Sequence, residues 1–368
     1  MKKKIKISCI AGTRPNFIKV APLISALNKV NSFKNELIHT GQHYDATMSD
    51  IFFKELNIKK PEINIYSGSG SHSVQTGRIM TGLEKRFLKN RPDLVIVVGD
   101  VNSTLAAALV TSKMHIPLAH VEAGLRSFDL TMPEEINRIV TDRLSEYLFT
   151  PSTDANDNLA KEGIDPRKIY FTGNIMIDTL VKFNKKINHK YVLKKYNLKK
   201  NDFCFLTLHR PSNVDNKEIF KKLSSVLKRI SKDIKIVFPA HPRTLKKMKE
   251  FGLMSLFNSK NILLTEPIGY LDTIALVASS QMVITDSGGL QEETTYLKVP
   301  CLTLRENTER PITSAIGTNT VVGTNTELLI EMVNRILNDD YKKGKRPKYW
   351  DGHTAQRIVH ILKRKLLL

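Results

Sequence analysis

The chain repeats one pattern: a short apolar run is followed by a longer amphipathic segment, and the alternation restarts after a polar stretch near residue 180. Short apolar runs bounded by turn residues are typical of buried parallel strands, and the amphipathic segments are typical of the helices that cover them. Strands are expected at residues 5–10, 35–39, 94–98, 117–121, 147–150 and 169–172, and then at 203–208, 234–239, 262–265, 282–285, 300–304 and 320–322. Helices of the first half are expected near residues 15–30, 46–56, 72–89, 102–113, 134–146 and 152–162. The pattern predicts an α/β fold with two doubly wound parallel sheets.

The polar, lysine-rich stretch at residues 178–200 interrupts this rhythm, so we place a domain junction at its beginning. A chain of 368 residues is longer than one hydrophobic core usually grows. We therefore expect an N-terminal Rossmann-like domain over residues 1–177 and a C-terminal one over residues 178–353, facing a cleft. The pattern of the last helical segment, residues 354–368, does not indicate which domain it packs against.

The net charge of +21 raises the alternative of a nucleic-acid-binding protein. The lysines, however, are spread over helical segments and short runs, without interleaved aromatic residues or a nucleic-acid motif. A solvated basic surface that steers an anionic substrate is the favoured interpretation, and we expect no nucleic-acid partner.

The three cysteines, Cys9, Cys204 and Cys301, lie in apolar runs without metal-ligand spacing, which favours reduced thiols in a cytoplasmic protein. No apolar stretch reaches the roughly 20 residues that cross a bilayer. The apolar N-terminal run leads directly into a Gly-Thr-Arg turn without a signal-peptide cleavage site. We expect neither a membrane partner nor a metal.

Carboxylates follow the central strands of the first half. Asp100 and Glu122 come directly after two expected strands, and Glu134 opens the next expected helix. Because parallel strands end at one edge of the sheet, the three carboxylates are expected there, where such sheets bind ligands. Crowded carboxylates raise one another's pKa, so one can accept and another donate a proton. For Glu135 the favoured interpretation is only complementation of the helix dipole.

Two strand-to-helix turns have features of phosphate-binding sites. In AGTRPNFIK, Arg14 and Lys19 accompany a helix N-terminus, which favours anions. In TDSGGLQEE, Ser287 is expected to cap the next helix, and the glycines Gly288 and Gly289 allow close approach of a diphosphate. One turn later, Glu292 or Glu293 is expected to accept hydrogen bonds from ribose hydroxyls.

Histidine–arginine pairs follow two strands of the second half. His209 and Arg210 end one strand, and His241 and Arg243 end the next. Their position beside the Gly-Gly turn indicates phosphate contact, and His209 is also a general acid/base candidate.

Taken together, the motifs resemble those of the non-hydrolysing UDP-N-acetylglucosamine 2-epimerases over nearly the whole chain. They are, in order, GTRPNFIKVAPL, TGQHYD, VVGDVNST, HVEAGLRS, MPEEINR, TLHRPSNVD, HPRT, EPIGYLD, DSGGLQEE and LRENTERPIT. The resemblance implies a glycosyltransferase-B-like fold, a UDP-sugar bound between the domains, a C-terminal helix at residues 354–368 that packs back on the first domain, and a homodimer.

The implied activity is reversible epimerisation of UDP-N-acetylglucosamine to UDP-N-acetylmannosamine, a precursor of cell-surface polysaccharide. Abstraction of the C2 proton accompanies anti elimination of UDP to a 2-acetamidoglucal, and UDP then adds back with a proton delivered to the opposite face. The resemblance implies neither a metal nor a nicotinamide cofactor.

Matched motif by motif, the resemblance implies catalytic roles for Asp100, Glu122, Glu134 and His209. Arg14 and Lys19 match the phosphate-side residues, Ser287 and Gly288 the diphosphate loop, and Glu293 the ribose ligand, while Arg310 resembles a further diphosphate contact. We predict Asp100 and Glu134 as the acid/base pair, assisted by Glu122 and His209. Which acid removes the proton and which returns it stays open.

The chain departs from the family where some bacterial members bind a second, activating UDP-N-acetylglucosamine. Those members carry QHR followed by Gln or Glu and an Arg-Gln pair, whereas this chain has Gln42-His43-Tyr44-Asp45 and Val74-Gln75. Gln42 and Gln75 are therefore the candidate allosteric residues, and the missing arginine argues against activation. The departures also leave open a modified UDP-amino sugar, such as the 2,3-diacetamido uronic acid derivative.

Three other functions are alternatives to this reaction. A hydrolysing epimerase would release free N-acetylmannosamine, a transferase of the same fold would need an acceptor pocket, and a non-enzymatic protein would only bind its ligand. PEEINR argues against the transferase, because its acids occupy the place where an acceptor would stand.

Overall fold

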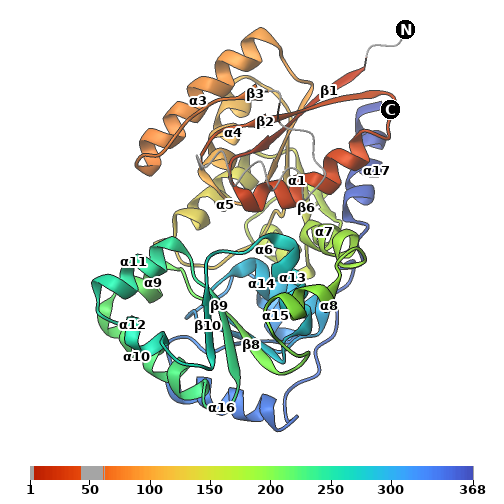
Figure 1. Ribbon diagram of the computed structural model, residues 1–368. Helices are drawn as coiled ribbons and strands as arrows, with labels where there is room; N and C mark the ends of the chain where they lie inside the picture. The colour runs from red at the N-terminus through yellow and green to blue at the C-terminus, as the bar shows by residue number, and fades with distance from the viewer. Residues whose placement is uncertain (1–3, 43–60, 62, 368) are drawn as a thin grey trace. The chain divides into compact units, whose positions relative to one another are not determined.

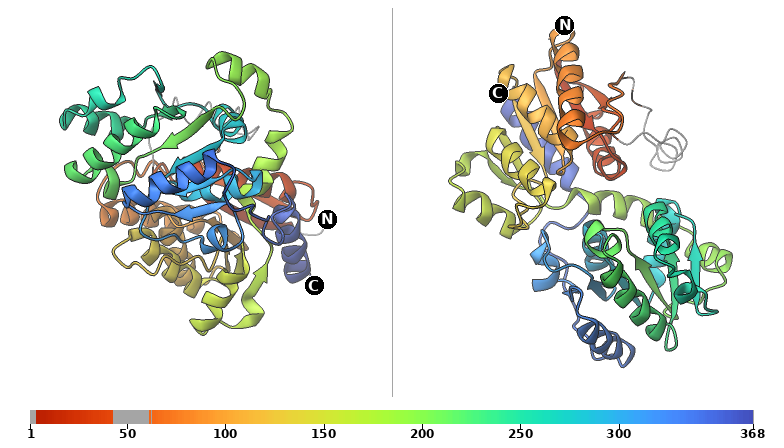
Figure 2. Two further views of the ribbon diagram at one scale, coloured as in Figure 1. Left: turned by 90° about the horizontal axis from the view of Figure 1, so that it is seen from below. Right: turned by 90° about the vertical axis from the view of Figure 1, so that its left-hand side faces the viewer.

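The computed structural model describes residues 4–42, 61 and 63–367. These residues form two compact units, unit 1 (Met1–Val181 with Lys348–Leu368) and unit 2 (Lys182–Pro347). Each unit contains one parallel sheet covered by helices (Figures 1 and 2). The chain leaves unit 1 inside α7 (Ile175–Asn184), a little later than the expected junction at residues 177/178.

The sheet of unit 1 has the strand order β3-β2-β1-β4-β5-β6-β7. Its strands are β1 (Ile5–Ala11), β2 (Phe33–His39), β3 (Ile63–Asn64), β4 (Leu94–Val98), β5 (Leu118–Val121), β6 (Tyr147–Thr150) and β7 (Ile169–Phe171). Its helices include α1 (Arg14–Leu27), α3 (His72–Lys89), α4 (Asn102–Lys113), α5 (Pro133–Leu144), α6 (Thr153–Lys161), the 3-10 helix η1 (Pro166–Lys168) and α17 (Thr354–Leu367). The order reverses between β1 and β4, and such a switch point is where α/β sheets bind ligands.

The sheet of unit 2 repeats this topology with the order β10-β9-β8-β11-β12-β13. Its strands are β8 (Phe203–Thr207), β9 (Lys235–Pro239), β10 (Ile262–Thr265), β11 (Met282–Thr285), β12 (Cys301–Thr303) and β13 (Asn319–Val321). Its helices are α8 (His189–Lys195), α9 (Pro211–Val214), α10 (Lys217–Ile230), α11 (Pro242–Glu250), α12 (Met254–Phe257), α13 (Tyr270–Ser279), α14 (Gly288–Leu297), α15 (Pro311–Ala315) and α16 (Thr326–Leu337). The switch point of this sheet lies between β8 and β11.

The predicted fold class is confirmed, with local differences. The edge strand β3 was not predicted, and the polar stretch expected to interrupt the pattern forms α8 and part of α7. Helix α8 buries Val192, while Lys195 pairs with Asp272 of α13 at 2.7 Å. The helix expected at residues 46–56 lies outside the described residues.

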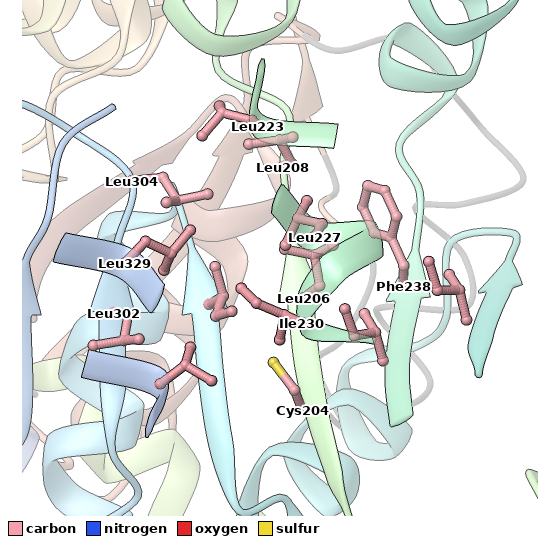
Figure 3. Packing of buried hydrophobic residues seen from close by; sticks show 14 of the residues in the cluster. Cys204, Leu206, Leu208, Leu223, Leu227, Ile230, Phe238, Leu302, Leu304 and Leu329 are labelled. Carbon is pink, nitrogen blue, oxygen red and sulfur yellow. The ribbon is translucent and has the colours of Figure 1, made fainter. Parts of the chain in front are cut away.

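The core of unit 2 shows why the apolar runs become strands (Figure 3). Leu206 on β8 and Leu302 on β12 pack in one cluster with Leu227 of α10 and Leu329 of α16, and all four side chains are fully buried. Each such burial contributes roughly 1.5–3 kcal/mol to folding. The side chains that make the short runs apolar are thus the ones that are buried between the sheet and the helices that cover it.

The C-terminal helix α17 packs against α1 of unit 1 (Figures 1 and 2). The carboxylate of Asp178 on α7 accepts hydrogen bonds from the backbone N–H groups of Thr354 (3.0 Å) and Ala355 (2.7 Å), at the start of α17. The Trp350 indole donates to the carbonyl oxygen of Pro151 at 3.0 Å. Among the described residues, no helix has the length and apolar character needed to cross a membrane.

Gly124→Ala is expected to destabilise unit 1 strongly. Gly124 has a φ of +81°, and a Cβ there would lie 2.3 Å from the carbonyl oxygen of Ala155. A left-handed backbone and a clash with main chain together should lower the free energy of unfolding by about 3 kcal/mol. Urea unfolding measures it, with Gly77→Ala as control, because a Cβ at that helical glycine meets nothing within 4 Å. Equal stability of the two variants would contradict the expectation.

Candidate active site

In unit 1, Asn16 holds the turn after β1. Its Oδ1 accepts hydrogen bonds from the backbone N–H groups of Gly12 (3.2 Å) and Thr13 (3.1 Å), and its Nδ2 donates to the carbonyl oxygen of Val98 (2.9 Å). A Cβ at Gly12 would lie 2.0 Å from the Ser103 Oγ, so only glycine fits. The turn after β1 is thus locked to the end of β4, across the switch point.

Glu122 follows β5 in a constrained environment. It is 4% exposed and has a φ of +73°, a left-handed conformation that costs energy for a residue other than glycine. Its Oε2 forms an ion pair with Lys19, whereas its buried Oε1 has no hydrogen-bond partner among the described residues. An unsatisfied buried carboxylate oxygen is costly. This oxygen is therefore suited to accept a hydrogen bond from a ligand.

The Lys19–Glu122 ion pair lies against the chain just before Asp100. A Cβ at Gly99 would lie 3.2 Å from the Lys19 Nζ and 3.7 Å from the Glu122 Oε2. Lys19 was predicted to contact phosphate, and the structure places its ammonium group on a candidate catalytic carboxylate. Two of the predicted acids, Asp100 and Glu122, are thereby brought to one edge of the sheet.

Arg138 of α5 connects two carboxylates. Its guanidinium forms an ion pair with Asp100 and a second one, at 2.6 Å, with Glu135. The interpretation of Glu135 as mere helix-dipole complementation was wrong. Glu135 is 1% exposed and accepts hydrogen bonds from the backbone N–H groups of Ser127 and Phe128. It therefore anchors the loop between β5 and α5.

Glu134 lies in the first turn of α5 and is half-buried. From the same helix, the Asn137 Nδ2 donates to the backbone carbonyl oxygen of Asp100 at 2.8 Å. Helix α5 therefore carries one candidate carboxylate, Glu134, and binds the chain segment that carries another, Asp100.

In unit 2, His209 and Asp286 meet across the switch point between β8 and β11. The buried Asp286 accepts hydrogen bonds from the backbone N–H groups of His209 and Arg210, both at 2.8 Å, and its Oδ1 lies 2.8 Å from the His209 Nδ1. Burial raises the pKa of Asp286, but the hydrogen bond and charge of His209 and the backbone donors outweigh it, so the pKa is lowered. The carboxylate orients the His209 ring, whose side chain is 40% exposed.

A pocket of about 220 Å³ opens beside this pair. It is lined by Phe205, Thr207, Leu208, His209, Pro239, His241, Pro267, Ile268, Thr273, Ser287 and Leu290. Mostly apolar walls with a few polar groups suit a planar heterocycle. The His241 ring lies 6.2 Å from that of His209, whereas Arg243, expected to act with His241, pairs with Asp215.

The Gly-Gly turn of unit 2 begins α14. Ser287 occupies the N-cap position, but the expected capping bond is absent within the described chain. The backbone N–H of Ser287 instead donates to the Thr285 hydroxyl at 2.9 Å, which fixes the turn. This N-terminal turn of α14 is suited to accept an anion, since free N–H groups and the helix dipole favour negative charge. Gly289 is the second residue of α14.

Arg310 lies directly against Gly288. A Cβ at Gly288 would be 2.5 Å from the Arg310 Nη1, so only glycine lets the guanidinium sit there. Arg310 forms ion pairs with Glu309 and, at 2.9 Å, with Glu292. These two carboxylates fix the guanidinium beside the N-terminus of α14.

Glu293, predicted to bind ribose, is almost completely buried. Its Oε1 accepts a hydrogen bond from the Tyr270 hydroxyl at 3.0 Å. Burial, and then the charge of Glu292, raise the pKa of Glu293 to about 8 although the Tyr270 hydrogen bond lowers it. Tyr270 was not singled out from the sequence.

Comparison with known proteins decides the family. A family model described as UDP-N-acetylglucosamine 2-epimerase matches residues 25–363. The chain belongs to the UDP-N-acetylglucosamine 2-epimerase family. A relative named UDP-N-acetylglucosamine 2-epimerase from Methanocaldococcus jannaschii is 46% identical, over 97% of this chain and 99% of its own.

Solved structures agree with this family and with the glycosyltransferase-B-like fold. The crystal structure of the Methanocaldococcus jannaschii UDP-GlcNAc 2-epimerase in complex with UDP-GlcNAc and UDP superposes with a TM-score of 0.91 at 47% identity, covering 98% of this chain and 100% of that one. A lipopolysaccharide outer core galactosyltransferase has a TM-score of 0.57 at 14% identity over 98% of this chain and 100% of its own, which shows likeness of fold alone.

The candidate allosteric residues of this epimerase family member lie beside the N-terminus of α4. The Gln42 Oε1 accepts hydrogen bonds from the Ser103 backbone N–H (3.1 Å) and hydroxyl (2.7 Å), and the Gln75 Nε2 donates to the Gln42 carbonyl oxygen (3.1 Å). Their allosteric role stays a prediction. His43, Tyr44 and Asp45 lie outside the described residues, as does the side chain of Arg14, the first residue of α1.

Proposed function

We propose that the protein interconverts UDP-N-acetylglucosamine and UDP-N-acetylmannosamine. The observation that carries this proposal is the family match over residues 25–363, together with relatives at 46–47% identity that bear this name. The modified UDP-amino sugar is not favoured, because relatives at 46% and 47% identity carry the name of the unmodified substrate, whereas a relative named for the 2,3-diacetamido uronic acid derivative is 37% identical. The hydrolysing reaction is not favoured, because the whole-chain motifs resemble those of the non-hydrolysing epimerases.

Unit 2 holds the nucleotide in this proposal. Uracil fits the pocket of about 220 Å³, whose walls are mostly apolar. The diphosphate occupies the N-terminus of α14, at Ser287, Gly288 and Gly289, where the helix dipole and the neighbouring Arg310 supply positive charge. His209, fixed by Asp286, stabilises the diphosphate as it departs.

Unit 1 moves the proton. One carboxylate removes the C2 proton while the bond between C1 and the diphosphate oxygen breaks, so the electron pair forms the C1–C2 double bond and UDP leaves as an anion. Re-addition of UDP to C1 with a proton delivered to the opposite face of C2 gives the epimer. Asp100 and Glu134 are proposed as the two acid/base groups, and Glu122, with its unsatisfied Oε1, as a group that orients the sugar.

The product assay tests the reaction. Purified protein is incubated with UDP-N-acetylglucosamine, and the anomeric proton signals are followed by NMR. We expect an equilibrium mixture with UDP-N-acetylmannosamine. Free N-acetylmannosamine would indicate a hydrolysing epimerase, and an unchanged substrate would refute the proposal.

UDP affinity is expected to rise with pH through Glu293. Glu293 keeps its proton below a pKa of about 8 in the unliganded protein, whereas ribose hydroxyls donate to the ionised carboxylate. Binding therefore releases a proton at neutral pH, so affinity increases by at most about tenfold per pH unit toward pH 8 and levels off above it. Titration calorimetry in buffers of different ionisation enthalpy measures the proton release. The same pH dependence in Glu293→Gln would assign the effect to another group.

We further propose a cytoplasmic homodimer. The dimer is supported by the family resemblance. A reducing compartment is supported by the three cysteines, which are all free thiols and buried. Sedimentation velocity would report a monomer if the dimer is wrong.

A further inference from the structure

A buried charged network in unit 1 has no part in the proposed reaction. The His120 Nδ1 lies 2.6 Å from the Asp142 Oδ1, and the Arg126 Nη1 lies 2.7 Å from the Asp142 Oδ2. Arg126 also donates to both carboxylate oxygens of Glu162, at 2.6 and 2.8 Å. The side chains of His120 and Asp142 are fully buried, and burying charges costs free energy unless each is paired. In this network each charged side chain has a partner of opposite charge or a histidine ring.

The network holds the chain on both sides of Glu122. His120 lies two residues before it on β5, and Asp142 binds the His120 ring. The Asp142 Oδ2 also accepts a hydrogen bond from the backbone N–H of Gly124 at 3.0 Å, two residues after Glu122. A left-handed residue such as Glu122 persists only where its surroundings fix it. Asp142 supplies that restraint.

The same pair reaches the segment that carries Asp100. The His120 Nε2 donates to the carbonyl oxygen of Gly99 at 2.9 Å, and the backbone N–H of Gly99 donates to the Val121 carbonyl oxygen at 3.1 Å. Gly99 has a φ of +68° and directly precedes Asp100. The ring therefore ties the end of β4 to the end of β5.

Hydrogen bonding fixes the orientation of the His120 ring. The Gly99 carbonyl oxygen can only accept, so Nε2 carries a proton. Burial raises the pKa of Asp142, but the charges of His120 and Arg126 outweigh it and the pKa is lowered. The Asp142 carboxylate lies 2.6 Å from Nδ1, on the other side of the ring. Since both ring nitrogens are hydrogen-bonded, the ring cannot turn without losing a bond.

We propose that the His120–Asp142 pair is a positioning device that fixes the two chain segments bearing Asp100 and Glu122. The inference rests on the proposed function. Asp142 lies on α5, which also carries Glu134, so one pair restrains all three candidate acids. Neither residue of the pair touches the substrate, and both act through the backbone of their neighbours.

Four variants test this inference. Asp142→Asn removes the negative charge and replaces one carboxylate oxygen, which faces the donors of His120, Gly124 or Arg126, by an amide NH2 group. His120→Leu removes both hydrogen bonds of the ring. His120→Gln keeps an amide that can donate to Gly99. The control is Glu162→Gln, which changes only the outer, 35% exposed end of the network.

We expect kcat to fall about 100-fold in Asp142→Asn and His120→Leu, since a misplacement of about 1 Å can cost that much. His120→Gln should recover part of this loss, and Glu162→Gln should match the wild type. UDP affinity, a property assigned to unit 2, should stay within about twofold in all four, and KM should change far less than kcat.

The outcomes separate the two proposals. A wild-type protein that does not epimerise UDP-N-acetylglucosamine refutes the proposed function, whereas an active wild type with unchanged kcat in Asp142→Asn and His120→Leu refutes the positioning role. Circular dichroism and UDP binding report folding. If Asp142→Asn is unfolded, the two His120 variants still test the positioning role, which predicts a higher kcat for His120→Gln than for His120→Leu. Equal kcat in these two variants, or unfolding of all three, would mean that the pair serves stability alone.

Discussion

Asp100→Asn is expected to lower kcat for epimerisation by about 1,000-fold, within the range typical of a lost general acid or base. The asparagine oxygen can still accept a hydrogen bond from Arg138, so the side chain should keep its place. What it loses is the ability to take up and return a proton. The dissociation constant for UDP should change by less than about twofold, because Asp100 is assigned to the sugar carbon and not to the nucleotide.

The matched control for this variant is Asp93→Asn. Asp93 is exposed and lies at the opposite end of the same strand, β4, where it accepts a hydrogen bond from the Lys6 backbone N–H at 2.7 Å. Initial rates should be unchanged in this control. If Asp100→Asn instead weakens UDP binding while kcat persists, Asp100 belongs to the nucleotide site.

Gly288→Ala is expected to weaken UDP binding about 100-fold, which corresponds to about 2.7 kcal/mol. The new methyl group would stand 2.5 Å from the Arg310 Nη1 and 2.7 Å from the Glu309 Oε1. The guanidinium must then move away from the N-terminus of α14, where the diphosphate is proposed to bind. Calorimetric titration with UDP measures the loss.

Gly77→Ala is again the appropriate control, since a Cβ there meets nothing within 4 Å and the residue lies in α3 of unit 1. It should bind UDP like the wild type. A Gly288→Ala variant that retains both its melting temperature and its UDP affinity would remove this turn from the diphosphate site.

The parallel sheets were predictable from the sequence because their central strands are continuous apolar runs. The run at residues 94–98 is completely buried in β4, as expected for a strand covered on both faces. Strand β3 has only two residues, Ile63 and Asn64, and so leaves no periodic pattern. The helix α8 was missed because its lysines obscure the one buried apolar position, Val192.

The candidate site was predictable where a residue directly follows a strand, as for Asp100, Glu122 and His209, because topology alone brings strand ends together. The residues that bind and orient these site residues were not predictable, because they lie far from them in the sequence. Asp286 lies 77 residues from His209, and Asp142 lies 22 residues from His120 on a different element. The aspartate in TDSGG, at the end of an apolar run, was the available signal for Asp286.

The central claim is that carboxylates of this protein exchange the C2 proton of a UDP-amino sugar with solvent. It is tested most directly by running the epimerisation of UDP-N-acetylglucosamine in D2O and recording the C2 proton signal of the product by NMR. The account predicts UDP-N-acetylmannosamine that carries deuterium at C2 from the first turnovers. Product that retains its original C2 proton would contradict it.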